Sequence, residues 1–323
     1  MFMQKKQSPA TRELVVAGYR VLLGREPENE TVVAEKMAHC HSEEDVLRAF
    51  TTAPEFNRRI QTYAQAMTDL LNARQKHIDI NVRDEVFEQL FLRIRNQWTA
   101  LTNSEPFWSV VSDERFRTPS IAQYKAEFYV SGSHDDGQID TFCQRTLTEP
   151  PRGVCLELGC GVGRVTRALA RRFERVIGVD ISEANLTIAD QHLQREGVNN
   201  IGLLLLRDID QLEQVEDFDF FYSIMVLQHN PPPIIARMLQ IILRKLRRGG
   251  SFFFQVPTLI PEYGFEAGAY LNTSAAESGY EMHALPMHAV LDIIVEAGAR
   301  IKEVMADARS GGPGSHVFFG IKA

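Results

Sequence analysis

The chain has 323 residues, with 35 Lys and Arg against 42 Asp and Glu, a net charge of −7 and a hydrophobic fraction of 44%. This length allows one large or two ordinary domains with a buried core. The acidic balance disfavours a protein whose main partner is a nucleic-acid backbone, so no nucleic-acid partner is expected.

Cysteine spacing and hydropathy exclude several other classes. No two cysteines form a CxxC pair, so neither a zinc ribbon nor a disulfide scaffold is indicated. His39 and His41 flank Cys40, but residues i and i+2 do not face each other on a helix, which favours two surface histidines over a metal. No apolar run approaches the roughly 18 residues that span a bilayer, and no signal-type segment follows the start, so a cytoplasmic protein is expected.

The N-terminal part predicts a bundle of short helices over about residues 10–72. Apolar residues repeat at helical spacing over Arg12–Leu23, and Gly24 follows where a left-handed C-cap would lie. A second helix is expected over Thr31–Ala38. Ser42 is a candidate N-cap with acidic residues in the following turn, and Pro54 is the candidate first residue of a fourth helix.

Two short segments of this bundle resemble a bacterial helical domain family of unknown function. They are Tyr19–Pro27, with its Leu-Leu-Gly-Arg core, and Ala53–Phe56, where Ala53 replaces the Ser of the family pattern. The resemblance implies an accessory domain of the kind found in proteins linked to bacterial surface structures and glycans. The alternative is an ordinary packing or dimerisation module, for which a homodimer is the expected assembly.

The segment after this bundle predicts a helical connector. Apolar residues repeat at helical spacing over Asp84–Trp98, which indicates a packed helix. The segment Tyr124–Gly137 combines aromatic residues with Gly and Ser, so it is either an active-site lid or a half-buried part of the connector. The expected domains are a helical accessory domain (1–75), a helical connector and lid (76–140) and a catalytic domain (141–323).

Beyond about residue 141, short β-rich runs alternate with amphipathic helical segments, which is typical of a doubly wound α/β fold. We expect a mostly parallel sheet of seven strands beside the N-terminal all-α domain. The predicted strands are Val154–Leu158, Arg175–Val179, Ile201–Leu206, Phe218–Met225, Ser251–Val256, Arg300–Met305 and His316–Lys322. The predicted helices are Gly163–Phe173, Glu183–Glu196, Pro232–Leu246 and Met287–Ala297.

A glycine-rich turn follows the first of these strands. Gly159, Gly161 and Gly163 allow a tight turn and close approach of a ligand, and the next helix begins with free N–H groups. The pattern fails the dinucleotide fingerprint, because the third glycine position holds Arg164 in one register and Thr166 in the other. A nucleotide-like ligand of another kind is predicted.

The neighbours of this turn resemble the class I S-adenosylmethionine-dependent methyltransferases. Glu157 precedes the glycines, and Asp180 follows the second strand, 21 residues after Gly159, where an acid can accept both ribose hydroxyls. NAD-binding enzymes share that acid. Arg207–Asp210 after the third strand and Gly249–Gly250 before the fifth strand resemble further motifs of the methyltransferase family.

This resemblance implies S-adenosylmethionine as cofactor, S-adenosylhomocysteine as product, and no metal. It implies that Asp180 holds the ribose, that Ile181 packs on the adenine, and that Asp208 and Ile209 bind the adenine edge. For Asp208 the alternatives are that Asp210 takes this role, or that both residues cap the following turn. The implied cofactor-binding residues are Glu157, Gly159, Cys160, Gly161, Gly163, Asp180, Ile181, Asp208, Ile209, Ser223 and Gln228.

Methyl transfer from a sulfonium needs few catalytic side chains, because the protein mainly positions the acceptor and excludes water. His229, at the carboxyl edge of the fourth strand, is the candidate general base for a hydroxyl acceptor. The alternative is that His229 binds the adjoining polar turn or shapes the pocket.

A long insertion, Pro257–Leu285, follows the fifth strand at the edge where open α/β folds bind substrates. Its residues Tyr280, Glu281 and His283 are candidate acceptor contacts, as is Tyr129 of the aromatic segment. The alternative for the insertion is a surface cover with ordinary aromatic residues.

The sequence therefore predicts an S-adenosylmethionine-dependent methyltransferase. The segment Gln228–Pro233 lacks the Asn-Pro-Pro-Tyr type of motif used for amino methylation. A hydroxyl oxygen of a small molecule or a glycan is therefore the expected acceptor. The chain itself is expected to have no membrane span. The alternative is a noncatalytic scaffold that retains the fold and binds partners.

Overall fold

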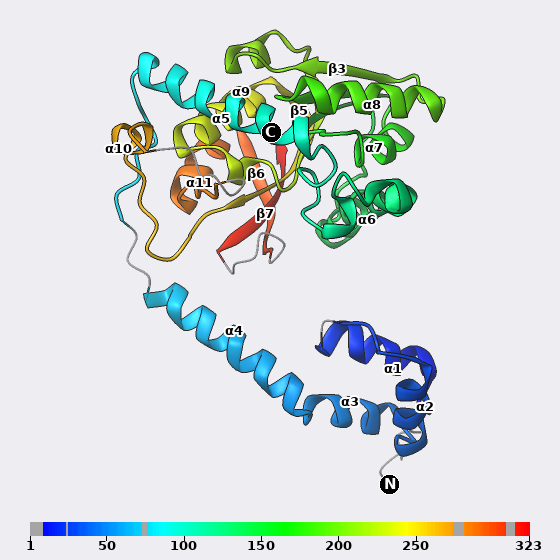
Figure 1. Ribbon diagram of the computed structural model, residues 1–323. Helices are drawn as coiled ribbons and strands as arrows, with labels where there is room; N and C mark the ends of the chain where they lie inside the picture. The colour runs from blue at the N-terminus through cyan, green and yellow to red at the C-terminus, as the bar shows by residue number, and fades with distance from the viewer. Residues whose placement is uncertain (1–8, 24, 73–75, 274–280, 308–313) are drawn as a thin grey trace. The chain divides into compact units, whose positions relative to one another are not determined.

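The computed structural model describes residues 9–23, 25–72, 76–273, 281–307 and 314–323 (Figure 1). The chain divides into two compact units, Met1–Asn72 and Ala73–Ala323. The predicted connector, residues 76–140, lies within the second unit.

The first unit is helical, as predicted. Its helices are α1 (Arg12–Gly18), α2 (Glu30–His39), α3 (Glu43–Thr51) and α4 (Pro54–Asn72), and a π-helical turn, η1 (Tyr19–Leu23), continues α1. The range predicted as the first helix, Arg12–Leu23, is helical throughout, and its second half adopts the π geometry. The predicted C-cap, Gly24, lies outside the described residues.

Two local interactions explain the motifs of this unit. Ser42 caps α3, accepting the Asp45 N–H while the Asp45 carboxylate accepts the Ser42 N–H in a reciprocal capping box. Arg25 donates two hydrogen bonds, of 2.6 and 2.9 Å, to the carboxylate of Glu55. This bidentate pair joins the Leu-Leu-Gly-Arg segment to the start of α4.

The second unit contains a mixed sheet with helices on both faces. Its strands are β1 (Val154–Leu158), β2 (Arg175–Asp180), β3 (Ile201–Leu205), β4 (Phe218–Ser223), β5 (Leu246–Pro257), β6 (Ala299–Ala306) and β7 (Ser315–Lys322). Its α-helices are α5 (Asp84–Ser104), α6 (Ile121–Thr146), α7 (Thr166–Arg172), α8 (Glu183–Arg195), α9 (Pro232–Lys245), α10 (Ala267–Leu271) and α11 (Met287–Glu296). Short 3-10 turns are η2 (Glu114–Phe116), η3 (Ile209–Gln214) and η4 (Leu227–His229).

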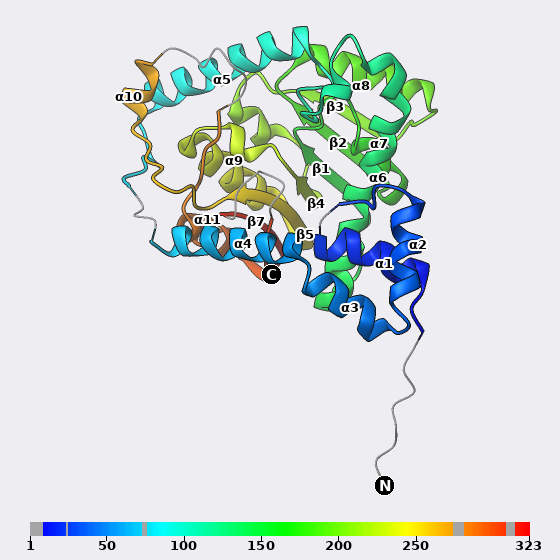
Figure 2. The same ribbon diagram turned by 60° about the horizontal axis from the view of Figure 1, so that its bottom comes forward.

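The strand order is β3-β2-β1-β4-β5-β7-β6, and the first five of these strands lie side by side in Figure 2. β1 to β5 pair in parallel, whereas β7 is antiparallel to both β5 and β6. The prediction of a doubly wound, mostly parallel seven-stranded sheet is confirmed. In such a sheet the strand order reverses beside β1, where ligands bind at the carboxyl ends of β1 and β4.

Alternating side chains of the strands build the two halves of the core. In β5, Phe252 and Phe254 face the cluster formed with α9 and α11, whereas Phe253 faces the cluster formed with α6 and α7. β4 repeats the pattern, with Phe221 on the first face and Phe220 on the second. The period of two along β4 and β5 thus buries both faces of the sheet at its centre.

The aromatic segment Tyr124–Gly137 is part of the long helix α6. Phe128 and Tyr129 are buried in a cluster with Phe107 and Phe116. The segment is therefore a packed helix in this structure.

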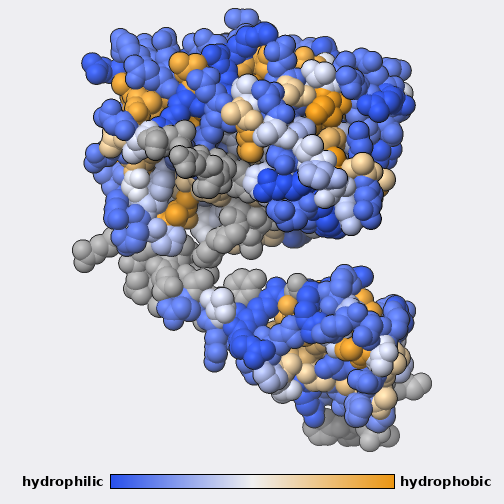
Figure 3. Space-filling view, in the orientation of Figure 1, coloured by the Kyte–Doolittle hydropathy of each residue, from blue (hydrophilic) through white to orange (hydrophobic). Residues whose placement is uncertain are grey.

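Hydrophilic residues predominate on the face drawn in Figure 3, with small hydrophobic patches interspersed. Among the described residues, no helix is both long and apolar enough to cross a bilayer.

Candidate functional site

In the glycine-rich turn between β1 and α7, two glycines adopt the left-handed backbone conformation that the sequence predicts for a tight turn. Gly159 and Gly161 have φ angles of +74° and +54°, in the left-handed region that favours glycine. A Cβ atom at Gly159 would lie 2.3 Å from Val226 Cγ2, and one at Gly161 would lie 2.6 Å from Val110 Cγ2. Only glycine therefore fits at these two positions, because a Cβ atom would clash with Val226 or Val110.

The carboxylate of Asp180 joins this turn to the end of β2. Its Oδ2 accepts the Gly161 N–H at 2.8 Å, and its Oδ1 accepts the Ser182 N–H at 2.8 Å. Burial raises the pKa of Asp180 above its ordinary value, while these backbone N–H groups oppose the shift. Each carboxylate oxygen has a second lone pair for a ligand.

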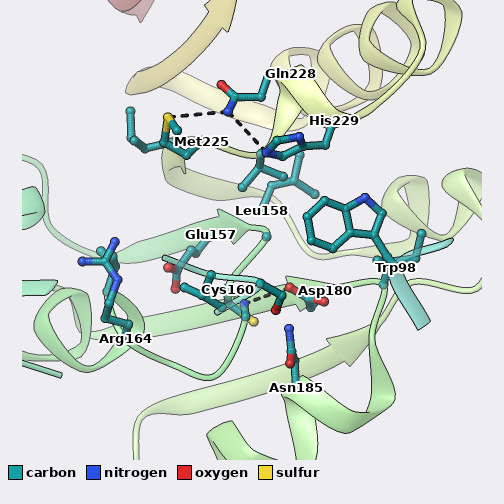
Figure 4. Close-up of a pocket in the computed structure, with 18 of the residues that line it drawn as sticks. Trp98, Glu157, Leu158, Cys160, Arg164, Asp180, Asn185, Met225, Gln228 and His229 are labelled. Carbon is teal, nitrogen blue, oxygen red and sulfur yellow. Dashed lines mark hydrogen bonds between the residues drawn. The ribbon is translucent and has the colours of Figure 1, made fainter. Parts of the chain in front are cut away.

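Asn185, in the first turn of α8, lies beside Asp180 in Figure 4. It is 3% exposed, and its Oδ1 has no hydrogen-bond donor among the described residues. A buried amide oxygen without a donor costs about 1–3 kcal/mol. Because Asn185 lines the same cavity as Asp180, the orphaned oxygen is suited to accept a hydrogen bond from a ligand.

The chain leaves β4 through a strained residue. Met225 has a φ of +61°, which a non-glycine residue seldom adopts. Its N–H donates to Gln255 Oε1 at 2.9 Å, a contact from β5 that holds this conformation. Such strain is typical of functional sites, and Met225 lines the cavity.

A buried network orients His229. The Nδ1 of His229 lies 3.2 Å from the Glu281 carbonyl oxygen, so Nδ1 carries the proton in this network. Its Nε2 lies 3.3 Å from Gln228 Nε2, which donates to it, and Gln228 Oε1 accepts from Gln255 Nε2 at 3.0 Å. The lone pair of His229 is therefore on Nε2. Burial lowers the pKa of His229 to about 4, so the imidazole is neutral at pH 7.

Helix α5 covers the cavity. Its residues Ile94 and Trp98 line the cavity, and the Trp98 ring lies 5.2 Å from the His229 ring (Figure 4). Ser182 Oγ donates to Thr102 Oγ1 at 2.7 Å, and both residues are buried. This hydrogen bond ties the end of α5 to the turn after β2.

These elements enclose a cavity of about 680 Å³, within the range of small-molecule sites. The charged residues that line it in the described part of the chain are Glu157, Arg164 and Asp180. Figure 4 shows them toward the glycine-rich turn, with Met225, Gln228 and His229 at the other end. The cavity thus has one charged end and one uncharged end.

The structure brings together most of the residues predicted for the site. Those that line the cavity are Glu157, Gly159, Cys160, Gly161, Asp180, Ile181, Gln228 and His229. Ser223 instead donates to the Leu158 carbonyl at 3.2 Å in the sheet. Gly163 packs near Ala189 and Leu193 of α8, so it serves close packing of helix and turn.

Asp208 and Ile209 lie outside the cavity lining. Asp208 is the N-cap of η3 and accepts the Asp210 N–H at 2.9 Å, which is the capping alternative considered from the sequence. Ile209 is fully buried in the core.

The predicted acceptor contacts that the structure describes do not line the cavity either. Tyr129 is buried, with its ring stacked 3.5 Å from that of His192 and its hydroxyl donating to Val162 O. Glu281 and His283 belong to a polar cluster of the insertion, although their neighbour Met282 does line the cavity. Tyr280 lies outside the described residues.

Sequence reasoning missed Trp98, Arg164, Asn185, Leu206 and Gln255. Trp98 belongs to α5, which is distant in sequence from His229. No sequence spacing indicates that these two residues meet. The place of Asn185 in the site could have been predicted from the sequence, because it lies five residues after Asp180 in the first turn of the next helix.

Part of the chain is similar to known methyltransferases. The family described as "Methyltransferase domain" matches residues 155–250. A ubiquinone biosynthesis O-methyltransferase of Pseudomonas fluorescens (strain Pf0-1) is 32% identical over 99 residues, which are 31% of this chain and 42% of that protein. Its counterpart in Acinetobacter baylyi is 27% identical over 156 residues, 46% of this chain and 64% of that protein.

The chain thus spans about two fifths of the length of the first of these relatives. Among solved structures, magnesium protoporphyrin IX methyltransferase from Synechocystis PCC 6803 with bound SAH is 17% identical, with a TM-score of 0.49. That alignment covers 71% of this chain and all of the other.

The buried environment of His229 predicts its titration. The imidazole resonances that disappear in His229→Gln should titrate with a midpoint near pH 4 in an NMR experiment on the native chain, because burial disfavours the imidazolium. An unfolded chain would give the ordinary value of about 6.5. A midpoint at or above 6.5 in the folded protein would contradict the described burial.

Proposed function

We propose that the chain, whose residues 155–250 match the methyltransferase-domain family, is an S-adenosylmethionine-dependent methyltransferase that transfers a methyl group to a hydroxyl oxygen of a small, apolar acceptor. One observation carries the proposal. A nucleotide-type cradle and a neutral, oriented imidazole line the same cavity.

The residues at the charged end fit S-adenosylmethionine, which supplies a methyl group already activated on a sulfonium. Asp180 would accept the ribose hydroxyls with its remaining lone pairs. Ile181 and Leu206 offer apolar contacts to the adenine, and the orphaned oxygen of Asn185 offers an acceptor to a nucleoside donor group. Gly159 and Gly161 let the backbone approach the ligand closely.

The uncharged end supports an apolar acceptor. Trp98 and Met225 line the cavity beside His229 and Gln228, Met238 also lines the cavity, and thioether and indole groups favour flat, apolar molecules. Near His229, the side chains of Gln228 and Asn230 already bond within the protein, to Gln255 and to the Val226 carbonyl. A glycan, the other acceptor predicted from the sequence, needs unengaged polar groups to bind its several hydroxyls, so the proposal favours the apolar acceptor.

His229 is the proposed general base. The lone pair on its Nε2 takes the proton of the acceptor hydroxyl as the oxygen attacks the methyl carbon. The hydrogen bond from Gln228 to this nitrogen is long, at 3.3 Å, so an acceptor hydroxyl can replace it. The cover formed by α5 excludes water from the reacting atoms.

The names of the relatives support an oxygen acceptor, since those proteins are O-methyltransferases of ubiquinone biosynthesis. A cytoplasmic location and a homodimer stay predictions from the sequence. The noncatalytic scaffold is the competing function, and it differs in that it binds the cofactor without turnover.

Adding a methyl group to the glycine-rich turn should weaken cofactor binding. Gly161→Ala forces a side chain into left-handed backbone and against Val110, so its calorimetric affinity for S-adenosylhomocysteine should fall about tenfold or more. Gly268→Ala is the matched control, because no heavy atom lies within 4 Å of the added Cβ. Equal affinities for the two variants would contradict the cradle.

Removal of the proposed base should reduce turnover without loss of the cofactor. With radiolabelled S-adenosylmethionine and a panel of phenols and aliphatic alcohols, His229→Gln should lower kcat about 100-fold and leave the affinity for S-adenosylhomocysteine nearly unchanged. His288→Gln, at an exposed position of α11, is the control. Unchanged kcat in His229→Gln would limit His229 to shaping the pocket, and cofactor binding without turnover by the native chain would favour the scaffold.

A further inference from the structure

A half-buried ionic cluster joins the insertion after β5 to α5, next to the segment whose backbone contacts His229. Its members are Arg93, Tyr270, Glu281 and His283, here called the Glu281 cluster. The side chains of Arg93 and Glu281 are 11% and 19% exposed, and Arg93 Nη2 donates to Glu281 Oε1 at 3.2 Å. The Tyr270 hydroxyl donates to Glu281 Oε2, and His283 Nε2 lies 3.7 Å from the same oxygen.

Arg93 holds the insertion by further contacts. Its Nη1 donates to the carbonyl oxygens of Tyr270 and Thr273 at 2.8 and 2.7 Å, and its guanidinium lies 4.0 Å from the centre of the Tyr270 ring. Because Arg93 belongs to α5, these contacts join the helix that covers the cavity to the insertion. The neighbouring His283, Tyr270 and Arg93 hold the pKa of Glu281 at about 2, so its carboxylate is ionised at neutral pH.

The backbone of the same short segment touches the site at two points. The Glu281 carbonyl oxygen accepts the proton on His229 Nδ1, and the His283 N–H donates to the Gln228 carbonyl at 2.7 Å. The carboxylate of Glu281 is thus anchored to α5 and α10 on one side, while its own carbonyl orients the imidazole on the other. A His tautomer is set by the hydrogen bond that its other nitrogen makes.

We propose that Glu281 is a positioning residue, whose anchored carboxylate fixes its backbone carbonyl and thereby holds the proton of His229 on Nδ1. The lone pair then stays on Nε2, which is the nitrogen required of the base. This inference rests on the proposed function for its catalytic consequence, but the tautomer itself is measurable without turnover.

A direct role in binding the acceptor fits Glu281 less well. The cavity lining contains Met282 but not Glu281, and both carboxylate oxygens are taken by partners in the cluster. An ionised carboxylate with these partners has no tendency to take up the acceptor proton. Its influence on the reaction therefore passes through His229.

The experiment compares the ring nitrogens of His229 by ¹⁵N NMR in the full-length native chain, Glu281→Ala and Tyr270→Phe. The native chain should show a protonated Nδ1 and an unprotonated Nε2. Glu281→Ala should show a mixture of tautomers, and Tyr270→Phe, which removes one hydrogen bond to Glu281, should show a smaller shift in the same direction. Glu266→Ala, which removes an exposed carboxylate of the same insertion, should match the native chain.

In turnover assays Glu281→Ala should lower kcat about tenfold and leave KM for the acceptor nearly unchanged. The loss is smaller than that expected for removal of the base itself, because His229 is still present. A native-like tautomer in both Glu281→Ala and Tyr270→Phe overturns the proposal. A rise in KM for the acceptor without a change in tautomer also overturns it, because that result indicates direct contact between Glu281 and the acceptor. If Glu281→Ala does not fold, Tyr270→Phe alone decides between these outcomes. Absence of turnover by the native chain would refute the proposed function, while the tautomer measurement would still test the positioning role.

Discussion

The hydrogen bond from the Gly161 N–H to the Asp180 carboxylate organises the site. It joins the turn after β1 to the end of β2, the two adjacent parallel strands whose carboxyl ends meet beside the cavity. The left-handed backbone of Gly161 aims its N–H at Asp180 and leaves the space that Val110 fills. The shape of the charged end of the cavity follows from this contact, because the turn, β2 and the start of α8 all meet at Asp180.

The other end of the cavity depends on elements that are distant in sequence. Gln255 of β5 holds the strained Met225 and also donates to Gln228, which in turn contacts His229. The insertion supplies the carbonyl that orients His229, and α5 supplies Trp98 and Arg93. Orientation of one imidazole thus requires four separate segments, all within the second unit.

Sequence patterns predicted the sheet well because both of its faces are buried. The central strands β1, β4 and β5 contain short apolar runs bounded by turn residues, and the β1 prediction, Val154–Leu158, matches the structure. β5 is longer than predicted, Leu246–Pro257 instead of Ser251–Val256, because Leu246, which precedes the glycines, also pairs with Phe218 of β4. The long helix α6 was harder to predict, because Gly, Ser and Asp interrupt its pattern and tertiary packing of Phe128 and Tyr129 compensates.

For the candidate site, the sequence indicated which residues lie together where they belong to neighbouring turns of the backbone. Gly159, Gly161 and Asp180 lie within two consecutive βα turns, so spacing alone indicated that they meet. Asp208 was predicted to face the ligand, but a capping interaction satisfies its carboxylate within its own turn. Trp98 and the role of Glu281 depend on packing of α5 against the insertion, which no local pattern encodes.

Calorimetric titration of the full chain and of Asp180→Ala with S-adenosylmethionine, S-adenosylhomocysteine and NAD tests the central claim most directly. The account predicts micromolar binding of both sulfur nucleosides, loss of that binding in Asp180→Ala, and no binding of NAD. Binding of NAD alone, or of none of the three ligands by the native chain, would contradict it.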